Sequence, residues 1–141
     1  MLEPIPHAVF TLTIEQFRSL GGVFPISSDI KLTKGDPTVF SVDGGNIIIH
    51  LPLDIPVQLT FKLPGTDHVL LGIAFDADTP RPKGRGNEFP KILIERSPKS
   101  CRLTVTDQGR TRNYYNYLLL IQDVATSEIG MIDPRIANEP N

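Results

Sequence analysis

The chain has 141 residues, of which 40% are hydrophobic and 21% charged, a composition that argues against wholesale disorder. This length suits one domain with one core, so we expect residues 1–141 to form a single domain. The formal net charge is only -2, whereas a domain that neutralises many phosphates is usually plainly basic, which weighs against nucleic acid as a partner.

The cysteine content and the N-terminus bear on the compartment. Cys101 is the single cysteine and cannot close a disulfide within the chain, as expected for a reducing compartment. The start MLEPIPHAVF lacks the basic residues and apolar run of a secretory signal, and no apolar stretch is long enough to cross a bilayer. We therefore expect a cytoplasmic protein that does not associate with a membrane.

The first half of the chain favours short strands. The whole chain contains 11 glycines and 13 prolines, which is above average usage, and these residues fall between short apolar runs. Residues 7–13 alternate between apolar and polar side chains, as in a half-buried strand, and residues 46–52 and 57–64 repeat this pattern. Residues 13–21 leave two interpretations open: a short helix closed by Gly21, or a continued first strand with a bulge.

Further strands are predicted after residue 67. Residues 68–78 are more continuously apolar than the preceding runs, which predicts a central strand with Gly72 as a bulge or close-approach point. Residues 91–97 and 101–107 alternate again. The sequence TDQGR at 106–110 then predicts a tight hairpin leading to the next strand.

The end of the chain predicts two more strands. Residues 113–123 are apolar on both faces and should form a central strand, whose tyrosines fill the core and send their hydroxyls to the rim or to backbone groups. Residues 129–132 predict a last short strand. Asp133-Pro134 suits a turn that locks this strand, with Ile136 folded back onto the sheet.

Strands of this length, spaced about ten residues apart with almost no helix between them, predict a definite fold class. We expect an all-β protein, an antiparallel two-sheet sandwich of the immunoglobulin-like type.

The polar loop at 75–90 provides the candidate ligand-binding residues. Cations alternate there with proline and glycine just after a pair of carboxylates, an arrangement that could meet an anionic ligand. The other interpretation is a solvated loop whose charges maintain solubility. The candidate residues are Asp76, Asp78, Arg81, Lys83 and Arg85.

No catalytic or metal motif stands out, so we expect no cofactor and no metal site. The three histidines lie far apart in sequence, and no histidine follows Cys101 as a copper site would require. There is no Gly-x-Ser-x-Gly elbow, and Cys101 begins a predicted strand, where an inert buried thiol is typical. An alternative hypothesis is a small hydrolase whose site forms only in the fold, from Asp76, Asp78, His50 and His68.

The ending DPRIANEP at 133–140 resembles the signature of the DP-EP family, small bacterial proteins named for these two dipeptides. YYNYLLLIQD at 114–123 and IDPRI at 132–136 are similar to the ending of bacterial inclusion-body proteins, although this chain has no tryptophan. Both resemblances imply an all-β fold, and neither carries over a catalytic residue.

Two functional hypotheses follow. The first is a non-catalytic binding or self-assembly module that uses a sheet face or the 76–90 loop, with a protein partner or a second copy of the chain. The second is the small hydrolase described above.

Overall fold

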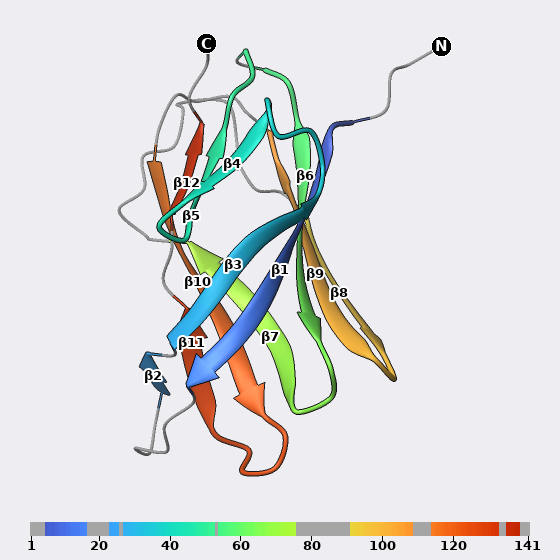
Figure 1. Cartoon of the computed structure of the whole chain (residues 1–141), viewed down its shortest axis with the longest axis vertical. Helices are drawn as coiled ribbons and strands as arrows, with labels where there is room; N and C mark the ends of the chain where they lie inside the picture. Colours follow the sequence, from blue (N-terminus) through green and yellow to red (C-terminus); the bar gives the residue numbers. More distant parts are fainter. Residues whose placement is uncertain are drawn as a thin grey trace.

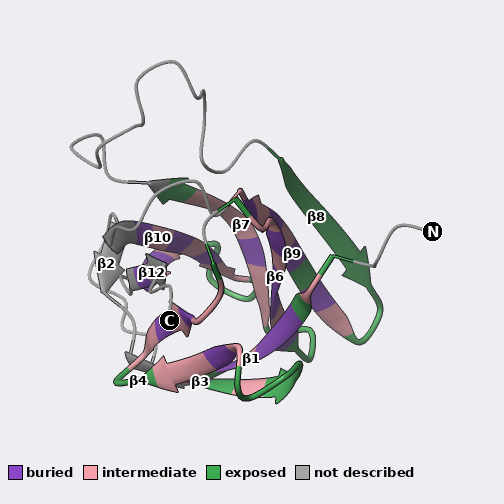
Figure 2. Ribbon diagram, turned by 90° about the horizontal axis from the view of Figure 1, so that it is seen from above, coloured by how far each residue is buried: buried purple, intermediate pink, exposed green. Residues whose placement is uncertain are grey.

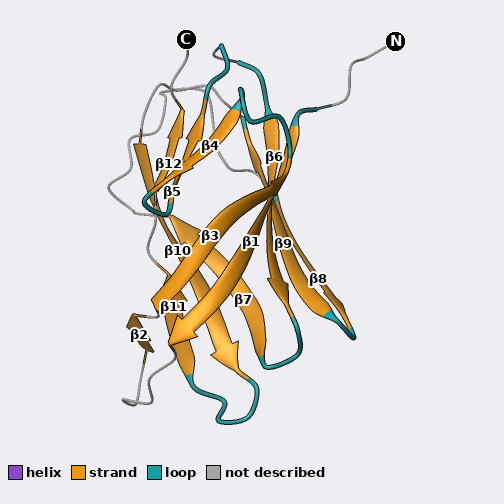
Figure 3. Cartoon of the chain, viewed as in Figure 1, coloured by secondary structure: helices purple, strands orange, loops and turns teal. Residues whose placement is uncertain are grey.

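The computed structural model describes residues 5–16, 23–25, 27–52, 54–75, 91–108, 114–132 and 135–138, which form strands and no helix (Figures 1 and 3). The prediction of an all-β protein is confirmed for these residues. Twelve strands are present among them: β1 (His7–Gln16), β2 (Val23–Pro25), β3 (Ser27–Lys34), β4 (Phe40–Asp43), β5 (Asn46–Ile49), β6 (Val57–Pro64), β7 (His68–Phe75), β8 (Ile92–Ser97), β9 (Ser100–Asp107), β10 (Tyr114–Asp123), β11 (Ile129–Ile132) and β12 (Arg135–Asn138).

The first sheet has the strand order β3-β1-β6-β9-β8. Its strands pair antiparallel, except that β1 and β6 are parallel. A parallel pair needs a long crossover connection, and the strands β2 to β5 lie between β1 and β6 in the chain. The strand β3 forms one edge of this sheet, and β8 forms the other.

The second sheet is built around β10, which pairs with β7 on one side and with β11 and β12 on the other. Ile132 of β11 pairs with Leu119, and Arg135 of β12 pairs with Asn116. Both β11 and β12 pair antiparallel with β10, so they run in the same direction. On the side away from β10, β2 pairs with β11, and β5 pairs with β12. The strand β4 then pairs with β5 at the edge of the sheet.

The C-terminal prediction is therefore corrected in part. The turn predicted at Asp133-Pro134 lies outside the described residues. The prediction that residues 129–132 form the last strand is wrong, because β12 follows β11 and also pairs with β10. Ile136 is fully buried, as expected.

Two other local predictions have different outcomes. The hairpin predicted at 106–110 is wrong, because β9 and β10 belong to different sheets and Asp107 is fully buried. The bulge predicted at Gly72 is confirmed: Leu120 pairs with Gly72 and Ile121 with Leu70, which leaves Leu71 as the extra residue. The first strand continues to Gln16 with a register shift after Ile14, as one of the two interpretations proposed.

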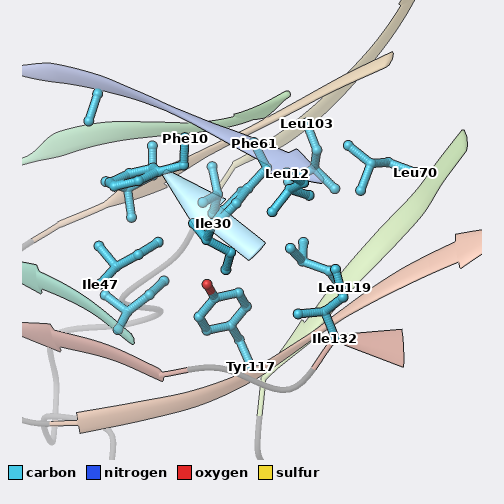
Figure 4. Packing of buried hydrophobic residues seen from close by; sticks show 14 of the residues in the cluster. Phe10, Leu12, Ile30, Ile47, Phe61, Leu70, Leu103, Tyr117, Leu119 and Ile132 are labelled. Atoms are coloured by element: carbon cyan, nitrogen blue, oxygen red, sulfur yellow. The ribbon is translucent and has the colours of Figure 1, made fainter. Parts of the chain in front are cut away.

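The core is a single cluster to which both sheets contribute (Figure 4). Alternation along β1, β6, β9 and β10 directs every second side chain into this cluster. Phe61 of the first sheet is its central aromatic residue. Its ring centroid lies 6.0 Å from that of Phe10 and 5.6 Å from that of Tyr117 in the second sheet. Aromatic contacts at these separations stabilise the packing beyond the area they bury.

Tyr117 differs from the expectation that core tyrosines send their hydroxyls to the rim. Its side chain is 1% exposed, and Figure 4 shows the hydroxyl directed into the apolar cluster. The hydroxyl has no hydrogen-bond partner among the described residues. Burial raises the pKa of this phenol well above its ordinary value of 10.0, because the charged form is not solvated there.

The Tyr117 hydroxyl should therefore reduce stability. We expect Tyr117→Phe to raise the free energy of unfolding by about 1 kcal/mol, since a buried hydroxyl without a partner carries a desolvation penalty. Above about pH 10 the gain should widen, because unfolded tyrosine then ionises while folded Tyr117 does not. Urea denaturation at neutral and alkaline pH measures both effects, and a variant less stable than the wild type would contradict them.

Candidate functional site

The predicted loop site lies outside the described residues. This applies to all five of its members: Asp76, Asp78, Arg81, Lys83 and Arg85. In the part of the chain that the structure describes, no group of three or more histidine, cysteine, aspartate or glutamate residues is arranged to hold a metal ion. Cys101 is buried, as expected for a structural thiol.

The two histidines of the hydrolase hypothesis lie at opposite ends of the second sheet. His68 pairs with Asp123 at the end of β10, whereas His50 follows Ile49, whose partner Asn138 lies just beyond the start of β10. The nine steps along β10 span about 30 Å at 3.3 Å per residue. These two side chains therefore cannot share one site.

Each of these histidines has a local partner. His50 Nε2 lies 3.3 Å from the hydroxyl of Ser41, and His68 Nε2 lies 3.9 Å from a carboxylate oxygen of Asp123. Such contacts orient a side chain at a strand end, and they are the satisfied polar positions that isolated histidines commonly occupy.

The third histidine, His7, begins a polar row across the outer face of the first sheet. Its Nε2 lies 2.7 Å from the hydroxyl oxygen of Thr60, which in turn lies 2.8 Å from that of Thr104. Partial burial, with a smaller effect from the positive charges of Lys34 and Arg102, lowers the pKa of the His7 imidazole below its ordinary value of 6.5.

The most unusual surface of the described residues is the β8 edge, residues Lys91 to Ser97. Every residue of β8 is exposed, although the strand is fully paired with β9 on one side (Figure 2). Three consecutive apolar side chains stand there, with Ile92 48%, Leu93 57% and Ile94 39% exposed. Ile92 and Ile94 pair with the buried Val105 and Leu103, so they extend the core face of the first sheet beyond the part that the second sheet covers.

The backbone of the β8 edge is also available for pairing. The N–H of Thr106 donates to the carbonyl of Lys91 at 3.2 Å, so the groups of Lys91 point toward β9. Successive residues of a strand alternate in direction, and the N–H and C=O groups of Ile92 and Ile94 therefore point away from β9. Among the described strands, only β9 pairs with β8.

Sequence reasoning located β8 but missed its exposure. Its alternating pattern indicated a half-buried strand, and the signal that the strand is an edge lay in the apolar run at 92–94 between Lys91 and Glu95. Burial depends on the position of the second sheet, which the local pattern of 91–97 does not contain.

No family model matches this chain, and no curated protein matches it. Among the described residues, no helix has the length and apolar character that a membrane span would need.

His7 should make stability sensitive to mild acid. As the pH falls below about 6.5, the unfolded chain takes up a proton before folded His7 does, so the free energy of unfolding decreases toward and through the lowered folded pKa. We expect His7→Gln to reduce this decrease. Urea denaturation at several pH values, together with NMR titration of the imidazole ring, measures it, and equal acid sensitivity of both proteins would contradict the assignment.

Proposed function

We propose that the two sheets form a sandwich of the immunoglobulin-like type. The strand order β1-β6-β9-β8 corresponds to the order ABED of an immunoglobulin sheet, and β7, β10 and the β11–β12 pair correspond to C, F and G. The shared core supports this arrangement. The parallel pairing of β1 with β6 departs from it, because β2 to β5 are inserted between strands A and B.

On this scaffold we propose a non-catalytic self-assembly module, suited to a reducing cytoplasm, in which the β8 edge pairs with the β8 edge of a second copy. The observation that supports it most is the exposed run Ile92–Ile94 beside backbone groups that pair with no other described strand. Stable monomers usually protect such an edge with charges, bulges or a covering segment, since it serves as a template for another strand. Pairing with a second copy satisfies the backbone and covers the apolar run together.

The sequence of β8 is self-complementary in one register. In a symmetric antiparallel pair centred on Leu93, this residue faces its own copy, Ile92 faces Ile94 of the second chain, and Lys91 faces Glu95. Ile92 and Ile94 carry the outward backbone groups, so each Ile92–Ile94 contact is a hydrogen-bonded pair. Leu93 then forms a close non-hydrogen-bonded pair on the outer face. Hydrogen bonds, apolar contacts and charge all agree in this register.

Moving the symmetry centre by one residue removes this agreement. A pair centred on Ile94 places Leu93 against Glu95 and Ile92 against Arg96, so the apolar residues meet charged ones. We therefore propose the register centred on Leu93. A strand of this length buries much less than the roughly 1,600 Å² of a standard interface, so the dimer should be weak and depend on concentration.

Lysine at position 93 should abolish the dimer, because two like charges would then lie directly opposite each other. In sedimentation velocity, the mass of the wild type should rise with concentration above the 15.6 kDa of one chain, whereas Leu93→Lys should remain monomeric. Val124→Lys is the matched control, since Val124 is 54% exposed and lies outside β8. A wild type that stays monomeric at every concentration would refute the proposed function.

Charge exchange tests the register. Lys91→Glu or Glu95→Lys alone should weaken the dimer, because each places like charges opposite each other, and the double variant should restore it. Cysteine substitution gives an independent readout: Leu93→Cys should form an intermolecular disulfide under mild oxidation, because Cα atoms about 4.5 Å apart suit this bond. Preferential crosslinking of Ile94→Cys would indicate the other register.

A further inference from the structure

A small pocket lies beside the β6–β7 and β8–β9 turns. Its volume is about 190 Å³, and its lining comes from the β6–β7 turn, the start of β7 and the β8–β9 turn. The backbone N–H of Gly65 donates to the carbonyl of Lys99 at 2.7 Å, and the N–H of Val124 donates to the carbonyl of Asp67 at 2.9 Å. These bonds join the β6–β7 turn to the β8–β9 and β10–β11 turns, so the pocket is held by backbone contacts.

The polar groups of the pocket are mainly hydrogen-bond donors. Its polar side chains are the hydroxyls of Thr66, Ser97 and Ser100, the imidazole of His68 and the guanidinium of Arg96, and no carboxylate is among the described residues that line it. A carboxylate oxygen of Asp123 lies 3.9 Å from Nε2 of His68. The hydroxyl of Ser97 lies 3.3 Å from the carbonyl oxygen and 3.3 Å from the hydroxyl oxygen of Ser100, so the two serines are in contact with each other at the pocket.

Arg96 provides the strongest argument. Arg96 pairs with Cys101, whose side chain is buried on the core face of the first sheet. The Arg96 side chain therefore projects from β8 on the side where the pocket lies. The guanidinium makes no hydrogen bond or ion pair with another described residue, whereas Lys31 on the same sheet is within 3.8 Å of Asp29. An arginine without a carboxylate partner presents several donors in a planar fork that matches an oxyanion.

We propose that this pocket binds a tetrahedral oxyanion of the phosphate class. About six water molecules would fill 190 Å³ at roughly 30 Å³ each, so five heavy atoms of a phosphate group fit in the pocket. Arg96 supplies the charge, and the imidazole of His68 and the hydroxyls of Thr66, Ser97 and Ser100 supply further hydrogen-bonding groups around the other oxygens. The site is separate from the self-pairing of β8, which uses the backbone edge and the Ile92–Ile94 side chains.

NMR titration with inorganic phosphate tests the site. Sodium chloride keeps the ionic strength constant, and sedimentation identifies a protein concentration at which the chain is monomeric, so failure of the dimer proposal does not affect the result. The amide signals of residues 65–68, 96–97 and 99–101 should shift and saturate. Arg96→Gln should weaken binding about tenfold, and Arg96→Lys should weaken it less, because a lysine keeps the charge and loses the fork.

Arg102→Gln is the matched control. It removes the same charge from the adjacent strand, but Arg102 is exposed, is paired with Glu95 in the register of β8 and β9, and does not line the pocket. Binding by Arg102→Gln should equal that of the wild type. Shifts that do not saturate, or equal weakening by Arg96→Gln and Arg102→Gln, would overturn the site and indicate only general attraction of anions.

Phosphoserine in the same titration distinguishes two sources of the phosphate group. Tighter binding than inorganic phosphate identifies a phosphorylated side chain or metabolite as the ligand, and equal or weaker binding identifies the free ion. If neither compound produces saturating shifts, the proposal is wrong.

Discussion

The whole structure depends on one apolar layer that both sheets share. Phe61 from the first sheet meets Phe10 beside it and Tyr117 from the second sheet, and the side chains around these rings come from strands far apart in sequence. Since burial of apolar area is the main favourable contribution to folding, this layer fixes which face of each strand points inward. The strands outside the layer are then the ones whose side chains remain available for recognition.

The strands differ in how strongly the layer constrains them. β6 and β9 bury side chains at alternate positions and bond on both edges, whereas β8 bonds on one edge and buries no side chain. Substitutions at exposed positions usually change stability by less than about 0.5 kcal/mol. Folding of one chain therefore does not explain the apolar run at Ile92–Ile94. We propose that contact with the β8 edge of a second chain explains it.

The local pattern predicted those features of the fold that depend on neighbours in sequence. Alternation located β1, β6 and β9, a run that is apolar on both faces located β10, and Gly72 marked the bulge in β7, because each of these properties depends on side chains a few residues apart. Strands with few apolar residues, such as β3 and β12, were missed, since their pairing partners are distant in the chain. The prediction of a hairpin at 106–110 was wrong for the same reason. Turn propensity does not show whether the two strands beside a turn pair with each other or belong to different sheets.

The candidate site likewise combines features that neighbours in sequence reveal with features that only contacts between distant segments create. Charges in the 75–90 loop are visible in the sequence. The pocket at Arg96 instead requires the β6–β7 and β8–β9 turns to meet, and pairing of β6 with β9 and a hydrogen bond from Gly65 to Lys99 bring these distant segments together. His68 was selected for the wrong partner, His50, which the second sheet places about 30 Å away. Its actual neighbour in the pocket, Arg96, belongs to β8. We propose that one exposed strand offers a backbone edge to a second chain and a guanidinium to a small anion, and these two proposed roles use different atoms of the strand.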